Sequence, residues 1–140
     1  MRTIKARRVC RNELINLFTN AGFINGIELT DEEVMTTQNT LFWHGVVRNE
    51  KARSKPNYIS YHFPAYEGKY NADNDDFLRE IMVAIDVFSK RSFDSKENND
   101  LLETLENIFR DNGFEVEFAD EIYETETSLF HYPITIFKLY

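Results

Sequence analysis

Cysteine, glycine-rich loops and long apolar runs are scarce in this 140-residue sequence. The single cysteine, Cys10, excludes a disulfide within one chain and a zinc site built from cysteines. No apolar run approaches the roughly 20 residues that span a bilayer. The five glycines form no loop of the kind that cradles a phosphate. Met1–Arg11 is basic and lacks an apolar segment, so we expect no signal peptide and a cytosolic, reducing setting.

Aromatic and acidic residues are plentiful by contrast. The chain contains 12 Phe and 7 Tyr, and hydrophobic residues make up 42% of it, which is enough for a folded core. Its length suits a single domain over residues 1–140. A pI near 4.9 argues against nucleic-acid binding as the main role, because phosphate contacts need a basic surface.

The charge is unevenly distributed along the chain. Residues 1–90 contain 12 basic and 12 acidic side chains, whereas residues 91–140 contain 4 basic and 12 acidic ones, so the net charge of −8 arises in the last fifty residues. This asymmetry suits head-to-tail self-association or docking onto a charged partner. The alternative interpretation is an ordinary soluble surface with scattered charges.

The first half begins with a predicted helix. Hydrophobic spacing predicts it over residues 6–21, after a basic lead at 1–8 and before a stop at Gly22. The polar stretch 24–40 is either a flexible connection or contains one helical turn, because Thr30 and Glu33 have the spacing of a capping box. Two strands should follow at 41–47, with a possible bulge at Gly45, and at 58–63, separated by a loop at 49–57.

The second half contains two long predicted strands. Residues 77–88 are apolar on both faces, which is typical of a central strand. A helix capped by Asn98 or Asn99 should end at Asn112-Gly113, before a strand over 114–118. The last strand, 129–140, contains Pro133, which indicates an edge position or a bulge. The order α-β-β-β-α-β-β predicts an α+β fold, with a mostly antiparallel sheet and two main helices packed on one face.

Few residues form a pattern that suggests catalysis or metal binding. Cys10 lies among arginines, which could lower its pKa, but a small side chain on a helix is the plainer interpretation. His44, His62 and His131 each fall in a predicted strand, and their spacing matches neither HxH nor HExxH. Asp86 interrupts an apolar strand. It is either a buried acid with a shifted pKa or a carboxylate that faces solvent or pairs with a neighbouring strand.

The loop over residues 67–76 carries three aspartates, Asp73, Asp75 and Asp76. Their alternation resembles part of a calcium loop. The glycine of the sixth position and the bidentate glutamate of the twelfth are missing, so a solvated loop is the better account. We therefore expect no metal, no cofactor and no enzymatic activity.

Five segments of the chain follow one another in a recognisable order. They are PNYISYHF, a loop with YNADNDD, REIMVAIDVFSKRSFD, LLETLENIFRDNGFEVEF and EIYETETSLFHYPITIF, within about residues 41–140. This order and spacing resembles the tail terminator and tail-completion family of tailed bacteriophages, also described as minor capsid or head–tail joining proteins. The resemblance is one of pattern and carries no catalytic signature.

The resemblance implies a structural virion protein assembled in the host cytoplasm. Six copies would form a ring on the head-proximal end of the tail tube, stop polymerisation of the tube protein and join the tail to the head connector. The genome DNA would pass through the lumen as cargo, and no membrane would be involved. The alternatives are a head-completion or connector protein of the same virion, or a small cytosolic protein-interaction module.

Two groups of charged residues are the predicted interaction sites. We expect either the basic residues Arg48, Lys51, Arg53 and Lys55 or those near the N-terminus to contact an acidic neighbour. Asp73, Asp75 and Asp76, with some carboxylates of residues 91–140, should face the lumen or the tube. An acidic lumen would repel the phosphates of passing DNA.

Overall fold

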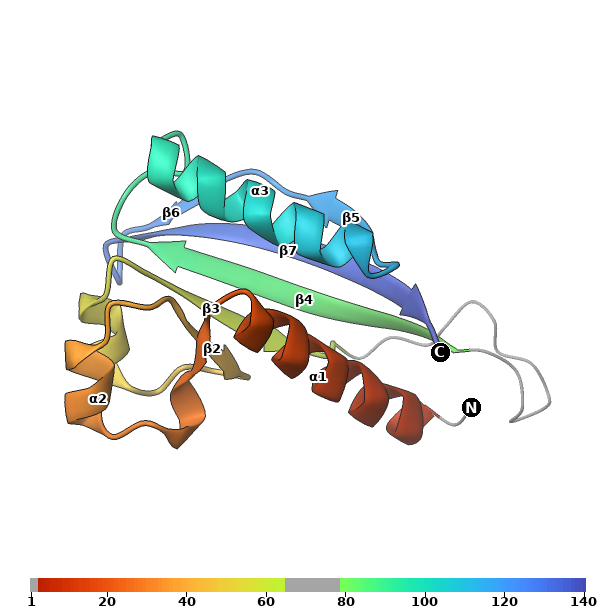
Figure 1. Cartoon of the computed structure of the whole chain (residues 1–140). Coiled ribbons are helices and arrows are strands. Elements are labelled where there is room, and N and C mark those ends of the chain that lie inside the picture. The colour runs from red at the N-terminus through yellow and green to blue at the C-terminus, as the bar shows by residue number, and fades with distance from the viewer. Residues whose placement is uncertain (1–2, 65–78) are drawn as a thin grey trace.

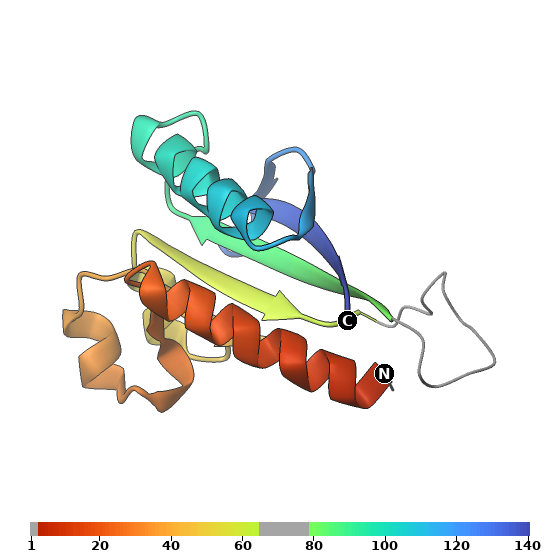
Figure 2. The same ribbon diagram turned by 45° about the vertical axis from the view of Figure 1, so that its right-hand side comes forward.

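A mixed sheet of seven strands forms the framework of the described residues, seen from two directions in Figures 1 and 2. The computed structural model describes residues 3–64 and 79–140. The helices are α1 (Thr3–Asn20), α2 (Asp31–Thr36) and α3 (Lys96–Asp111), with 3-10 helices η1 (Gly26–Glu28) and η2 (Glu50–Ser54). The strands are β1 (Ile24–Asn25), β2 (Leu41–His44), β3 (Asn57–His62), β4 (Glu80–Ser89), β5 (Glu115–Phe118), β6 (Ile122–Glu124) and β7 (Leu129–Leu139).

The strand order is β1-β2-β3-β4-β7-β5, and β6 pairs with the other end of β7. The β1–β2 and β2–β3 pairs are parallel, and the remaining four pairs are antiparallel. The predicted α+β class with a mostly antiparallel sheet is therefore confirmed. Neither β1 nor β6 was predicted, because two or three residues are too few to show a period of two.

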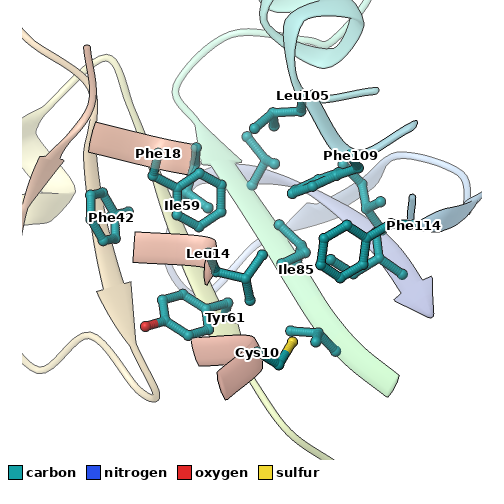
Figure 3. Close-up of a cluster of buried hydrophobic side chains, with 14 of the residues drawn as sticks. Cys10, Leu14, Phe18, Phe42, Ile59, Tyr61, Ile85, Leu105, Phe109 and Phe114 are labelled. Carbon is teal, nitrogen blue, oxygen red and sulfur yellow. The ribbon is translucent and has the colours of Figure 1, made fainter. Parts of the chain in front are cut away.

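Helices α1 and α3 lie on the same face of the sheet, as both views show. The buried side chains of α1 recur every four residues and form one stripe: Ala6, Cys10, Leu14 and Phe18. Leu105 and Phe109 of α3 enter the same core. The ring of Phe18 is central, with Phe42 at 5.0 Å and Phe109 at 6.0 Å between centroids (Figure 3).

Strand β4 occupies the centre of the sheet, between β3 and β7, as its two apolar faces predict. Alternate residues from Ile81 to Ser89 are buried under the helices. The opposite side of β4 and β7 is only half buried, and we call it the open face. It carries Met82, Ala84, Asp86 and Phe88 of β4 and His131, Pro133, Thr135, Phe137 and Leu139 of β7.

A second, smaller core lies on the other side of the sheet at its β1–β3 end. Val34 of α2 and Ala52 of η2 pack there against Leu41, Trp43 and Tyr58. Among the described elements, α2 and η2 thus cover only one end of the open-face side. The rest of that side has no described helix over it.

Segment 24–40 contains three short elements, so the alternative of one helical turn describes it better than a flexible connection. Thr30 caps α2 and accepts a hydrogen bond from the Glu33 amide, while the Glu33 carboxylate accepts one from the Thr30 amide. Gly26 lies beneath the indole of Trp43, where an added Cβ would meet ring atoms at 2.1 Å. These contacts fix the segment against β2.

Several predicted boundaries differ from the observed ones. Helix α1 begins at Thr3, so most of the basic lead at 1–8 is helical. Strand β2 ends at His44 because Gly45 has a φ of +84°, which turns the chain out of the sheet. The N-cap of α3 is Ser95, whose hydroxyl accepts a bond from the Asn98 amide, rather than Asn98 or Asn99.

Pro133 lies inside β7, in register with Asp86 of β4, and occupies neither an edge strand nor a bulge. Its carbonyl accepts a hydrogen bond from the Ala119 amide, on the side away from β4. In an antiparallel ladder the N–H and C=O of one residue face the same neighbour. The nitrogen of Pro133 therefore faces the gap between the end of β5 and the start of β6, where no strand pairs with this side of β7. Its lack of an N–H group costs no hydrogen bond of the sheet.

The described helices do not include one that is both long and apolar enough to cross a lipid bilayer.

Candidate interaction surfaces

The N-terminal half of α1 carries a cluster of three arginines: Arg7, Arg8 and Arg11. We call it the arginine cluster. Together with His44, His62 and Phe63 at the ends of β2 and β3, it lines a hollow of about 450 Å³. Arg7 donates from Nη2 to the carbonyl of Pro64 over 3.3 Å. No carboxylate within residues 3–64 and 79–140 forms an ion pair with these three guanidinium groups.

The position of these arginines is unfavourable for the helix itself. The first turn of α1 contains Lys5 and no acidic residue, so a further cation lies at the positive end of the helix dipole, just before the arginine cluster. Arg7 and Arg11 are one turn apart, and like charges at this spacing repel. Arg11 also adds to burial in lowering the pKa of His44. A group of cations held together at this cost is a reason to look for an anionic partner.

The predicted basic residues between β2 and β3 divide into two kinds. Arg48, Lys51 and Arg53 are exposed and free to meet a partner surface. Lys55 is only 8% exposed, and its Nζ donates to the carbonyl of Thr37 at the end of α2. Lys55 therefore holds α2 against η2 within the chain. Asp73, Asp75 and Asp76 lie outside the described residues.

The opposite edge of the molecule presents an acidic groove between α3 and β5. Glu103, Glu106, Phe118 and Tyr132 line it, and we call it the α3–β5 groove; its volume is about 380 Å³. The rings of Phe118 and Tyr132 meet edge to face at 6.1 Å. Burial raises the pKa of Tyr132, and the nearby carboxylates Asp120 and Glu121 raise it further. The groove thus combines aromatic rings with negative potential.

Asp86 lies on the open face and pairs with His131 of the neighbouring strand, as one of the two interpretations predicted. His131 Nε2 is 2.6 Å from Asp86 Oδ1, and both side chains are less than 20% exposed. His62 approaches the other carboxylate oxygen at 3.8 Å, and Glu124 lies 3.6 Å from His131 Nδ1. The hydrogen bond to Asp86 raises the pKa of His131, against the effect of burial.

A hollow of about 470 Å³ adjoins this charged group. Arg53, Tyr58, Ser60 and Phe88 are among the residues that line it. The rings of Tyr58 and Phe88 stack at 5.0 Å, and that of His131 stacks on Phe88 at 4.6 Å. The register of β3, β4 and β7 produces this row, since the three residues are directly opposite one another.

The buried cysteine belongs to a network that joins α1 to the end of the chain. Tyr140 donates from its hydroxyl to Glu13 over 2.6 Å, and Lys138 donates to the same carboxylate over 2.5 Å. Cys10 contacts Tyr140, and burial raises the pKa of its thiol to about 11. The thiol is therefore protonated at neutral pH and cannot act as a thiolate nucleophile.

The three histidines do not converge on one point. His44 stacks on Tyr61 on the helix-covered face at 5.0 Å, whereas His62 and His131 flank Asp86 on the open face. Within residues 3–64 and 79–140, no three side chains of the metal-binding types are grouped to hold an ion.

Comparison with protein-family models, curated proteins and solved structures finds no match to this chain.

Proposed function

We propose that this chain is a structural subunit of a tailed-phage virion. Six copies form a ring on the head-proximal end of the tail tube, stop its polymerisation and join the tail to the head connector. The pattern of segments over residues 41–140 suggests this role. The observation that carries it is the open face, which leaves one side of the longest strand pair without a described covering element.

The open face carries apolar side chains of the kind found in protein–protein interfaces. Met82 and Ala84 are half buried along β4, and Leu139 at the end of β7 is 45% exposed. Contiguous apolar area of this kind usually marks a protein–protein contact. Because α2 and η2 cover only one end of this side, the described residues leave the remainder accessible to another subunit or partner.

Exposed charges would supply the specificity of assembly. Arg48, Lys51 and Arg53 project from the β2–β3 connection and suit an acidic surface on the tube protein or the connector. Six copies of a chain with net charge −8 would carry about −48, which favours passage of DNA without adhesion. The role is one of binding and capping, and the proposal assigns no catalytic step to the chain.

Native mass spectrometry and negative-stain electron microscopy of the purified protein test the proposal. The expected particle is a ring of six 16.6 kDa subunits, about 100 kDa, which shortens tubes when it is added to polymerising tube protein. A ring of twelve subunits that leaves tube length unchanged would favour the connector alternative. A monomer or dimer with no effect on tubes would favour a small interaction module.

A charge reversal separates joining from ring formation. Arg48→Glu combined with Lys51→Glu should leave the ring mass unchanged and reduce the yield of joined, infectious particles, because these side chains make no contact that the core needs. Lys51→Ala alone is the milder control. Unchanged joining by the double variant would remove this surface from the proposal.

A further inference from the structure

We propose that the arginine cluster of one copy docks into the α3–β5 groove of a second copy. The inference rests on the proposed ring and names the two surfaces that build it. Among the described residues, neither the arginine cluster nor Glu103 of the groove forms an ion pair, and each surface has the chemistry that the other needs.

The arginine cluster cannot reach the acidic side of its own molecule. On the side of α1 toward β7, Glu13 and Cys10 are occupied with Lys138 and Tyr140. The arginines lie on the other side, over His44 at the end of β2. In Figure 2, α1 runs along the β3 side of the sheet and α3 along the β7 side. Within residues 3–64 and 79–140 these cations have no carboxylate partner, which leaves them available to an anionic surface of another copy.

The α3–β5 groove has the composition of a guanidinium site. Glu103 and Glu106 supply carboxylates one helical turn apart, and Phe118 and Tyr132 supply ring faces. Guanidinium groups bind carboxylates through paired hydrogen bonds and stack on aromatic rings, which an ammonium does less well. Glu106 already accepts from Arg110 Nε at 3.0 Å, whereas Glu103 is exposed and forms no ion pair within the described residues. Glu103 is thus the carboxylate available to an incoming arginine.

The two surfaces lie at opposite edges of the sheet, so their contact is heterologous. A head-to-tail contact either closes into a ring or continues as a filament. The net charges agree with this direction: Thr3–Asn20 contains four basic residues and one acidic residue, and Lys96–Asp111 contains two basic and five acidic residues. The two symmetric pairings, arginine cluster with arginine cluster and α3–β5 groove with α3–β5 groove, would bring like charges together and are disfavoured by their repulsion.

Reversal of one charge on each surface tests the contact. Arg8→Glu and Glu103→Arg both change exposed side chains, so each variant should keep its far-UV circular dichroism and urea midpoint. Each should weaken self-association by about tenfold or more at low salt, since a like-charge pair replaces an opposite pair. The chain that carries both changes should recover the wild-type mass. Arg8→Gln should give a smaller loss in the same direction.

Mixing the two single variants gives a sharper result. The Glu103→Arg chain keeps its arginine cluster, which fits the unchanged groove of the Arg8→Glu chain. The new carboxylate at position 8 of the Arg8→Glu chain in turn faces the new guanidinium at position 103 of the other, so both contacts between unlike chains are attractive whereas contacts between like chains are not. The mixture should therefore recover a ring of about 100 kDa in which the two chains alternate, although neither variant forms it alone. Arg48→Glu alters the net charge by the same amount and, as the matched control, should leave the ring mass unchanged.

Three results would overturn the inference. If both single variants keep the wild-type mass, the ring stands and the assigned contact is wrong. If the single variants dissociate but the doubly changed chain does not reassemble, the two residues do not face each other. If the wild-type protein is itself monomeric under all conditions, the inference and the proposed function fail together.

Discussion

Asp86→Asn should destabilise the protein more at pH 6 than at pH 9. The reason is the contact with His131, where Nε2 lies 2.6 Å from the carboxylate and both side chains are mostly shielded from water. A hydrogen bond between charged partners contributes about 1.5–3 kcal/mol, against about 0.5–1.5 kcal/mol for neutral ones. The variant should therefore lose about 2 kcal/mol at pH 6, where the imidazolium is present, and about 1 kcal/mol less than that at pH 9.

The direction of this pH dependence follows from the raised pKa of His131. Asp86 raises the pKa of His131 in the folded state above the ordinary 6.5. The stabilisation is complete below that unfolded-state value and is lost as the pH rises through the higher folded-state value. The contact of His62 with Asp86 contributes little to stability, because the His62 side chain is 49% exposed and its Nδ1 lies 3.8 Å from the carboxylate.

Urea unfolding followed by fluorescence of the single tryptophan, Trp43, measures the difference directly, since the indole is buried. Glu117→Gln, which removes a carboxylate from an exposed site on β5, is the control and should show no such pH dependence. An equal loss of unfolding free energy at pH 6 and pH 9 for Asp86→Asn would refute the reasoning, because a charged pair could not then be the source.

Three further changes have definite expected results. Gly26→Ala should displace the indole of Trp43, since the new Cβ would lie 2.1 Å from it, and tryptophan emission should shift to the red with a lower urea midpoint. Cys10 should resist Ellman's reagent in the folded protein and react at once in 6 M guanidinium chloride, because it is fully buried and burial raises its pKa to about 11; rapid labelling of the native chain would contradict this. Thr30→Ala should lower the free energy of unfolding in urea by about 1 kcal/mol through loss of the capping box, whereas Thr36→Ala, at the other end of α2, should lower it less.

The elements that the sequence predicted well are those whose burial is periodic and local. Burial alternates along the whole of β4 and around Ile134 and Ile136 in β7, and the buried stripe recurs along α3, so each pattern reports its own element. The parallel pairing of β2 with β3 could not be inferred, because it depends on where the intervening chain lies. Strands β1 and β6 were missed because they are stabilised by a partner strand and have almost no pattern of their own.

The candidate surfaces were predictable only in part. The basic run from Arg48 to Lys55 was visible as a charge pattern, but a 3-10 helix within it buries Lys55 beneath α2 while its neighbours stay exposed. The pairing of Asp86 with His131 joins residues 45 positions apart, and only the register of β4 and β7 brings them together. The alternation of β4 contained part of the clue, since Asp86 interrupts a face that is otherwise apolar.

The attachment of α1 has a consequence for how the chain folds. Its Glu13 is bound by Lys138 and Tyr140, partners more than 120 residues later. Helix α1 precedes the other described elements in the chain. Phe18 of its stripe can pack on Phe42 and Tyr61 once β2 and β3 have been made, but Glu13 meets its partners only after β7. Contacts so distant in sequence slow folding, because a long loop must close before they form. The side of α1 that packs toward β7 is therefore covered late in folding, and a circularly permuted chain in which β7 directly precedes α1 should bury it earlier and fold faster.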